Sequence, residues 1–138
     1  MTKTSIINRD LAKLLAAQGH KDKFMVCDAG FAIPKDAICI DLSLKKDVPT
    51  VPEVLEEIKN HFSVEAVAIA KETQEINPSR FEYFKSVFDD AEVEITNIAY
   101  FRKHSKDEMK FFIRTGDFTA FSNIAITSGS GDGWHCEN

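Results

Sequence analysis

The residues best suited to acid–base chemistry lie near the start of the sequence. His20 stands in Gly19-His20-Lys21-Asp22, and Asp28 follows a short apolar run over residues 24–27. A histidine titrates near neutrality and can act as both general acid and general base. A carboxylate at the end of a strand can orient that imidazole or bind a ligand rich in hydroxyl groups. Ligands of open α/β sheets bind beyond the carboxyl ends of strands, so both groups are expected there. The alternative is that His20 only caps the first helix, where a cation is favourable.

A second group of polar residues runs from Tyr100 to Asn123. Its first half is basic in an otherwise acidic chain, with Tyr100, Arg102, Lys103, His104, Lys106 and Lys110. One interpretation is a site for an anion or a polyol. The other is a solvated helix face, with Ser105 and Glu108 forming a capping box.

Motifs for cofactors and metals are absent from the sequence. The glycines show neither a dinucleotide-binding nor a P-loop pattern, and no G-x-S-x-G nucleophile elbow occurs. The three cysteines are widely spaced without a C-x-x-C pair, which argues against disulfides and structural zinc. His135 and Cys136 are two ligands, and a zinc site needs three or four. We therefore expect no cofactor and no metal.

Hydrophobic periodicity indicates helices alternating with short strands. Helices are predicted over residues 9–17, 51–59 and 78–88, and strands over 24–27, 38–42, 64–70, 93–98, 111–114 and 124–126. Residues 64–70 are predicted to be a central strand. This alternation predicts a single α/β domain with a largely parallel sheet flanked by helices. Residues 129–138 are rich in glycine and are expected to form a flexible C-terminal tail.

Composition narrows the class of protein. The 138 residues carry 17 basic and 22 acidic side chains, a net charge of -5. A nucleic-acid-binding protein normally has a basic excess, so no nucleic-acid partner is expected. No apolar run is long enough to cross a bilayer, and residues 1–9 lack the apolar core of a signal peptide. A soluble cytoplasmic protein without a membrane partner is therefore expected.

The segment GHKDKFMVCDAGFAIPK, Gly19–Lys35, resembles the signature of the D-ribose pyranase family of sugar mutarotases. Related L-fucose mutarotases share its G-H-x-D…D-A core but diverge afterwards. Weaker similarity continues to about Ser128, so residues 1–128 are expected to form one mutarotase-like α/β domain. The resemblance implies a cofactor-free isomerase that interconverts the pyranose and furanose forms of a free aldose. It also implies that His20 is the catalytic acid/base and that Asp28 binds the sugar.

Two segments depart from the family pattern. The family's Tyr-x-Asn triplet is Phe121-Ser122-Asn123 here, so the phenol is lost and the amide is kept. The family's His-x-x-x-Lys pair falls on Tyr100 and His104 in one alignment and on Lys106 and Lys110 in another. We expect sugar contacts from His104 and from the Phe121–Asn123 triplet, through Phe121, Ser122 and Asn123.

The family also forms ring-shaped homo-oligomers, typically decamers, with each site at a subunit boundary. If this applies here, the Tyr100–Lys110 segment reaches a neighbour's His20. The leading hypothesis is a ribose-type mutarotase. The alternatives are a mutarotase for another aldose such as L-fucose, and a sugar-binding or regulatory protein with weakened turnover.

Overall fold

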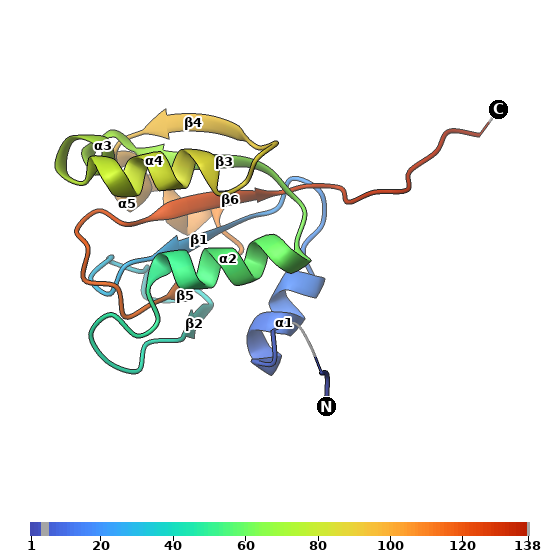
Figure 1. Ribbon diagram of the computed structural model, residues 1–138, viewed down its shortest axis with the longest axis horizontal. Coiled ribbons are helices and arrows are strands. Elements are labelled where there is room, and N and C mark those ends of the chain that lie inside the picture. Colours follow the sequence, from blue (N-terminus) through green and yellow to red (C-terminus); the bar gives the residue numbers. More distant parts are fainter. Residues whose placement is uncertain (4–5, 138) are drawn as a thin grey trace.

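The computed structural model describes residues 1–3 and 6–137, so residue 138 of the predicted tail lies outside it. Helices and strands alternate along most of the chain, and Figure 1 shows the sheet at the centre of the molecule. The helices are α1 (Arg9–Ala16), α2 (Val51–His61), α3 (Lys71–Ile76), α4 (Pro78–Ser86) and α5 (Ile98–Glu108). The strands are β1 (Lys23–Cys27), β2 (Cys39–Asp41), β3 (Val64–Ala70), β4 (Glu92–Thr96), β5 (Phe111–Arg114) and β6 (Ile124–Ser128).

The six strands form one sheet in the order β2-β5-β1-β6-β3-β4. Strands β2, β5 and β1 pair in parallel, as do β3 and β4, whereas β6 runs antiparallel to both β1 and β3. Five strands therefore point the same way, which confirms the prediction of a largely parallel sheet. The two central strands are β1 and β6; β3, predicted to be central, lies next to the edge strand β4.

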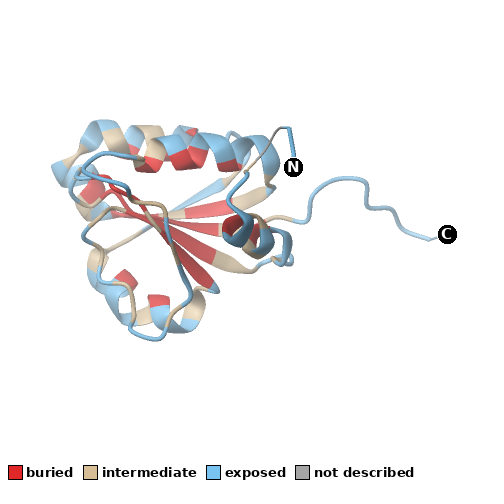
Figure 2. Cartoon of the chain, turned by 90° about the horizontal axis from the view of Figure 1, so that it is seen from below, coloured by how far each residue is buried: buried red, intermediate tan, exposed pale blue. Residues whose placement is uncertain are grey.

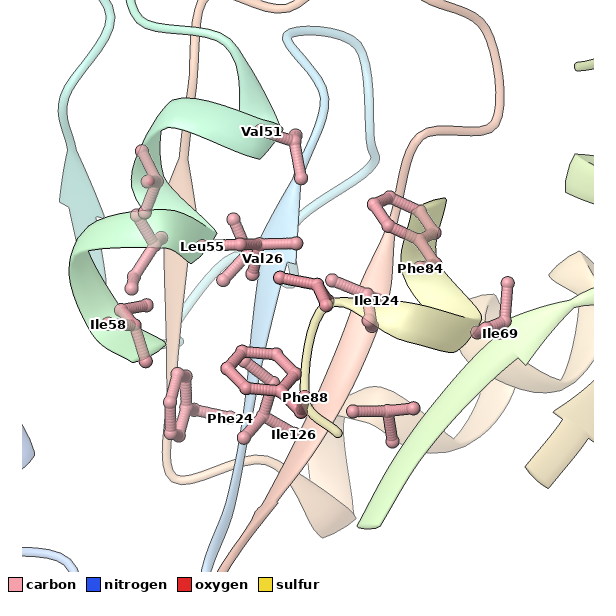
Figure 3. Close-up of a cluster of buried hydrophobic side chains, with 14 of the residues drawn as sticks. Phe24, Val26, Val51, Leu55, Ile58, Ile69, Phe84, Phe88, Ile124 and Ile126 are labelled. Atoms are coloured by element: carbon pink, nitrogen blue, oxygen red, sulfur yellow. The ribbon is translucent and has the colours of Figure 1, made fainter. Parts of the chain in front are cut away.

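Alternation along β1 divides the core into two layers. Phe24 and Val26 face the larger layer, which Figure 3 shows packed against α2 and α4. Met25 and Cys27 point to the opposite face and pack with Phe101 of α5. A strand that is buried on both faces in this way is typical of a parallel sheet covered by helices. Figure 2 shows the buried strands between these helical layers.

Local signals explain most helix boundaries. The side chain of Asn8 accepts a hydrogen bond from Leu11 N at 3.0 Å and caps α1. Thr50 and Glu53 form the capping box expected at the start of α2. The capping box predicted at Ser105 is wrong: α5 begins at Ile98, where Asn97 is the cap, and Ser105 is buried inside the helix. The preceding strand consequently ends at Thr96, two residues earlier than predicted.

Beyond β6 the chain leaves the sheet and continues without regular secondary structure, as Figure 1 shows. Gly129 N and Gly131 N donate to the backbone and side chain of Ser63, at 2.8 and 3.2 Å. Over the described residues, none of the helices has the length and apolar character required to cross a membrane.

Candidate functional site

Asp28 lies directly after β1, at the carboxyl end of the sheet, and is tied to the start of β6. Its backbone N–H donates to Asn123 Oδ1 at 2.9 Å, and Asn123 Nδ2 donates back to Asp28 Oδ2 at 3.3 Å. Ser122 N and Gly30 N also donate to the carboxylate, at 3.2 and 3.1 Å. The structure therefore brings together Asp28, Ser122 and Asn123, three of the predicted site residues.

The surroundings of Asp28 change its acidity. Burial raises the pKa of its carboxyl, and the hydrogen bonds from Gly30 N, Ser122 N and Asn123 oppose that rise only in part. Asn123 is only 2% exposed, so its hydrogen bond to the Asp28 carboxylate is shielded from water and holds that carboxylate in place. A braced, partly desolvated carboxylate is a strong acceptor for hydroxyl groups.

A hollow of about 310 Å³ opens in front of Asp28. Arg114, Phe118 and Thr119 contribute to its lining, together with Ala29 and Gly30. Arg114 donates to Asp41 Oδ2 at 3.1 Å and to the carbonyl of Ala29 at 3.2 Å, so its guanidinium is fixed at the rim. The size is at the lower end of the range for small-molecule sites, and Asp28, Arg114 and Thr119 supply polar groups beside the apolar Phe118. The arrangement suits a small polyhydroxy ligand.

The loop after β5 lines the rest of the hollow and is held in place by buried hydrogen bonds of Asp117. Asp117 is 1% exposed and accepts from Val51 N at 2.8 Å and from Arg80 Nη1 at 2.8 Å. Burial raises the pKa of Asp117, but hydrogen bonds from Thr119 N, Val51 N and Arg80 outweigh it and lower the pKa overall. The same Arg80 nitrogen also donates to Ser122 Oγ. Arg80 thus connects α4 to the segment that holds Asp28.

Phe121, where the family has tyrosine, has a φ of 57°, an uncommon left-handed conformation for a bulky residue. Its carbonyl accepts a hydrogen bond from the Thr73 hydroxyl. The loop thus fixes the backbone around Phe121, and its phenyl ring is half-buried.

His20 lies at the other end of β1, before its first residue Lys23, and not beside Asp28. The expectation that both lie at the carboxyl end of the sheet is therefore wrong within one chain. A five-residue strand rises by about 17 Å, too far for a side chain to bridge. His20 Nε2 lies 2.8 Å from Glu65 Oε1, and Lys21 Nζ pairs with the other oxygen of the same carboxylate. Helix α1 ends at Ala16, and the imidazole contacts Glu65 rather than capping that helix.

His104 lies on α5 and its ring contacts that of Tyr100 at a tilt of 41°, with ring centroids 4.4 Å apart. The Tyr100 hydroxyl donates to Glu108 Oε1 at 2.5 Å. Arg102, Lys103 and Lys106 are exposed on the same helix, as expected for a solvated face. Those contacts keep His104 within the α5 surface, apart from the contacts that hold Asp28.

Two positions that sequence reasoning missed contribute to these clusters. Glu65 lies in an apolar strand pattern, VEAVAIA, and Arg80 lies in a helix with no motif around it. A charged residue inside a predicted buried strand was the available signal for Glu65, because such residues are almost never buried unpaired. Within residues 1–3 and 6–137 no group of three or more potential metal ligands comes together.

Comparisons with known proteins identify the family of this chain. The sequence model of the RbsD / FucU transport protein family matches residues 1–130. D-ribose pyranase of Kosmotoga olearia is 36% identical over 129 residues, covering 94% of this chain and 98% of the relative. D-ribose pyranase of Staphylococcus haemolyticus is 39% identical over 129 residues, with the same coverage.

Solved structures give the same result. The structure of Bacillus subtilis RbsD complexed with D-ribose matches with a TM-score of 0.90 and 33% identity, covering 96% of this chain and 100% of that one. The fucose mutarotase from Streptococcus pneumoniae in complex with L-fucose matches with a TM-score of 0.69 and 18% identity, covering 91% of this chain and 95% of that one, and so shares the fold. The chain belongs to the RbsD / FucU transport protein family.

Proposed function

We propose that this protein is a D-ribose pyranase, an isomerase that interconverts the pyranose and furanose forms of D-ribose by acid–base ring opening. The observation that carries the proposal is the braced Asp28 carboxylate facing a hollow of about 310 Å³. This site lies in a fold that matches a ribose-bound relative with a TM-score of 0.90 at 33% identity. D-ribose pyranases are also 34% and 39% identical to it over nearly the whole chain.

The chemistry needs few groups. A base removes the proton from the anomeric hydroxyl, the C1–O bond to the ring oxygen breaks, and the ring oxygen takes a proton. Reclosure through a different hydroxyl reverses these steps and gives the other ring size. In the proposal His20 takes and returns the proton, a role that typically contributes about 100- to 10,000-fold in rate. Asp28 accepts hydrogen bonds from sugar hydroxyls, and Asn123 keeps its carboxylate in place.

Because His20 and Asp28 lie at opposite ends of β1, a complete site requires two copies of the chain. The His20 end of one copy then meets the Asp28 end of its neighbour, and the α5 surface with His104 lies at this boundary. The proposal therefore includes a homo-oligomer, and the resemblance to the family suggests a decamer as its size. The cytoplasmic location expected from composition stays a prediction.

Saturation-transfer NMR on D-ribose tests the activity, with the wild type compared with His20→Asn. The wild type is expected to exchange pyranose and furanose signals faster than buffer, and His20→Asn to return to the buffer rate. Wild-type exchange no faster than buffer would refute the enzyme. Saturable ribose binding together with that result would instead support a sugar-binding protein.

L-fucose is the second substrate to test, because Phe121 lacks the phenol that the family uses. Preferential exchange of L-fucose would reassign the substrate without changing the chemistry. Analytical ultracentrifugation tests the shared site: a monomer that retains full exchange activity would exclude it.

A further inference from the structure

Glu65 occupies an irregular position at the start of β3. Val64 pairs with Ser128 of β6 and Ala66 pairs with Thr127, so two steps along β3 match one step along β6. Glu65 is therefore the extra residue of a β-bulge. Bulges redirect a side chain that would otherwise follow the regular alternation of the strand. Here the redirected carboxylate meets the His20 imidazole at 2.8 Å.

The turn that carries His20 is fixed independently. Gly19 N donates to Asp22 Oδ2 at 2.8 Å, which closes the turn on itself. Lys21 N donates to Ser128 O at 3.0 Å, and Ser128 N donates to Asp22 O at 2.8 Å. Lys21 has a φ of 78°, a left-handed conformation that these bonds hold. The end of β6 thus pairs with both the turn and the bulge and sets the two side chains against each other.

The carboxylate determines which imidazole nitrogen bears the proton. Hydrogen bonds from His20 and from Lys21 lower the pKa of Glu65, so the group is ionised near neutral pH. An ionised carboxylate only accepts hydrogen bonds, so the nitrogen that faces it, Nε2, must carry hydrogen. In the neutral ring Nδ1 then keeps its lone pair and is the nitrogen available to a ligand.

We propose that Glu65 is a positioning residue for His20, which holds the imidazole as the Nε2–H tautomer and leaves Nδ1 to exchange protons with the sugar. Lys21 fixes the second oxygen of the carboxylate. This inference rests on the proposed function for the identity of the proton donor. Nδ1 takes the proton of the anomeric hydroxyl, the C1–O ring bond breaks with its electron pair on the ring oxygen, and Nδ1–H returns the proton there. During the step the Nε2–H contact, which is charge-assisted from the start because Glu65 is ionised, becomes an ion pair between an imidazolium and a carboxylate.

The effect of Glu65 is expected on turnover and not on sugar affinity, because its contacts are with His20 and Lys21. Loss of one hydrogen bond to a charged group corresponds to a rate loss of about 10- to 100-fold. Glu65→Ala is therefore expected to lower kcat by this factor with an unchanged KM. Glu65→Gln keeps an oxygen that can accept from Nε2 and is expected to fall between Glu65→Ala and the wild type.

The matched control is Glu57→Ala. Glu57 Oε1 and His61 Nε2 form the same kind of pair at 3.1 Å on the exposed face of α2. Its removal is expected to change neither the exchange rate nor the His20 ring signals.

Long-range ¹H–¹⁵N spectra of the His20 ring, recorded without sugar near neutral pH, test the positioning itself. The wild type is expected to show a protonated Nε2 and a bare Nδ1, and Glu65→Ala to show the mixed tautomers of a free imidazole. A wild-type ring protonated on Nδ1 would overturn the inference. So would a Glu65→Ala variant that keeps both the wild-type ring signals and the wild-type kcat. If the wild type shows the expected tautomer but does not accelerate ribose exchange, the proposed enzymatic activity is refuted while the positioning of the His20 ring by Glu65 still holds.

Discussion

Replacing Asn123 by aspartate tests the Asp28 cluster by exchanging a single heavy atom, the amide nitrogen, for an oxygen. Asn123 Nδ2 donates to Asp28 Oδ2 at 3.3 Å, and Asn123→Asp puts an oxygen in place of that donor. With the two charges about 4 Å apart at an effective dielectric constant of about 20, the repulsion is about 4 kcal/mol. Asn123 is 2% exposed, so little water is available to reduce it. We therefore expect Asn123→Asp to lower the free energy of unfolding by about 4 kcal/mol near neutral pH.

The loss should depend on pH with a defined sign. In the folded variant one carboxyl of the pair holds its proton to a higher pH than it does in the unfolded chain, so the folded state binds more protons. Stability then falls as the pH rises, by about 1.4 kcal/mol per pH unit from about pH 4 to about pH 7, where the loss of about 4 kcal/mol is complete. Below about pH 4 the two carboxyls are protonated in both states, and the electrostatic part of the loss disappears.

Urea unfolding at about pH 5 and about pH 8, at one fixed chain concentration because the chain is proposed to associate, measures this difference. The control is Asn97→Asp, an identical change at the cap of α5, where the side chain accepts from Tyr100 N at 2.8 Å. Aspartate caps helices as well as asparagine does, so the control should be neutral at both pH values. Equal losses for Asn123→Asp at both pH values would show that packing, and not charge, determines the cost. If Asn123→Asp lowers the free energy of unfolding by less than about 1 kcal/mol at the higher pH, the conclusion that the Asp28 cluster is shielded from water is wrong.

Three further changes probe the loop around the hollow. Arg80→Met leaves the 1% exposed Asp117 without its cation and is expected to cost about 3 to 5 kcal/mol in denaturant unfolding; a loss below 1 kcal/mol would contradict the buried pair. The pKa of Asp117 is lowered in the folded protein, so its ionised form stabilises the fold above an ordinary aspartate pKa of about 3.9, and this stabilisation is lost as the pH falls below that value. Arg80→Met removes part of this dependence, so the stability of the variant should fall less steeply with acid than that of the wild type. Gly116→Ala places a Cβ 2.3 Å from the backbone carbonyl of Lys45 and should lower the melting temperature by the equivalent of about 1 to 3 kcal/mol, whereas an unchanged melting temperature would mean that this loop yields freely. Phe121→Tyr restores the family phenol and should improve kcat/KM for D-ribose about 10-fold in the NMR exchange assay, and no change would show that the hydroxyl has no partner in this site.

Most of the fold could be predicted from periodicity and capping residues. Strands such as Phe24–Cys27 are apolar on both faces, and Thr50 with Glu53 marks the start of α2. Helix α3 was missed because it follows β3 without a loop, and its N-cap residue, Ala70, has no polar side chain that could mark a helix start. The start of α5 was misplaced because Ser105 and Glu108 imitate a capping box inside a helix whose real cap is Asn97.

The site was predictable in part, because local motifs identify residue types but not their separation in space. The resemblance of Gly19–Lys35 to a known signature predicts roles for His20 and Asp28, yet both were expected at one end of the sheet. Their separation follows from strand β1 lying between them, at residues that were themselves predicted as a strand. The contact with Glu65 depends on the register between β3 and β6, which joins residues far apart in sequence. The register between such strands depends on the whole sheet and cannot be predicted from a local sequence pattern.

The single antiparallel strand has a consequence for how the molecule opens. Strand β6 follows directly after Asn123, which bonds to Asp28, and ends at Ser128, which bonds to the His20 turn, so this strand connects the two polar clusters. It also lies between β1 and β3 in the middle of the sheet. If β6 separated from the sheet to expose one polar cluster, its pairing with β1 and β3 would be lost at the other cluster as well. Amide hydrogens of β1 and β6 should therefore exchange with deuterated water together, at the rate of global unfolding, while those of the edge strand β4 exchange sooner.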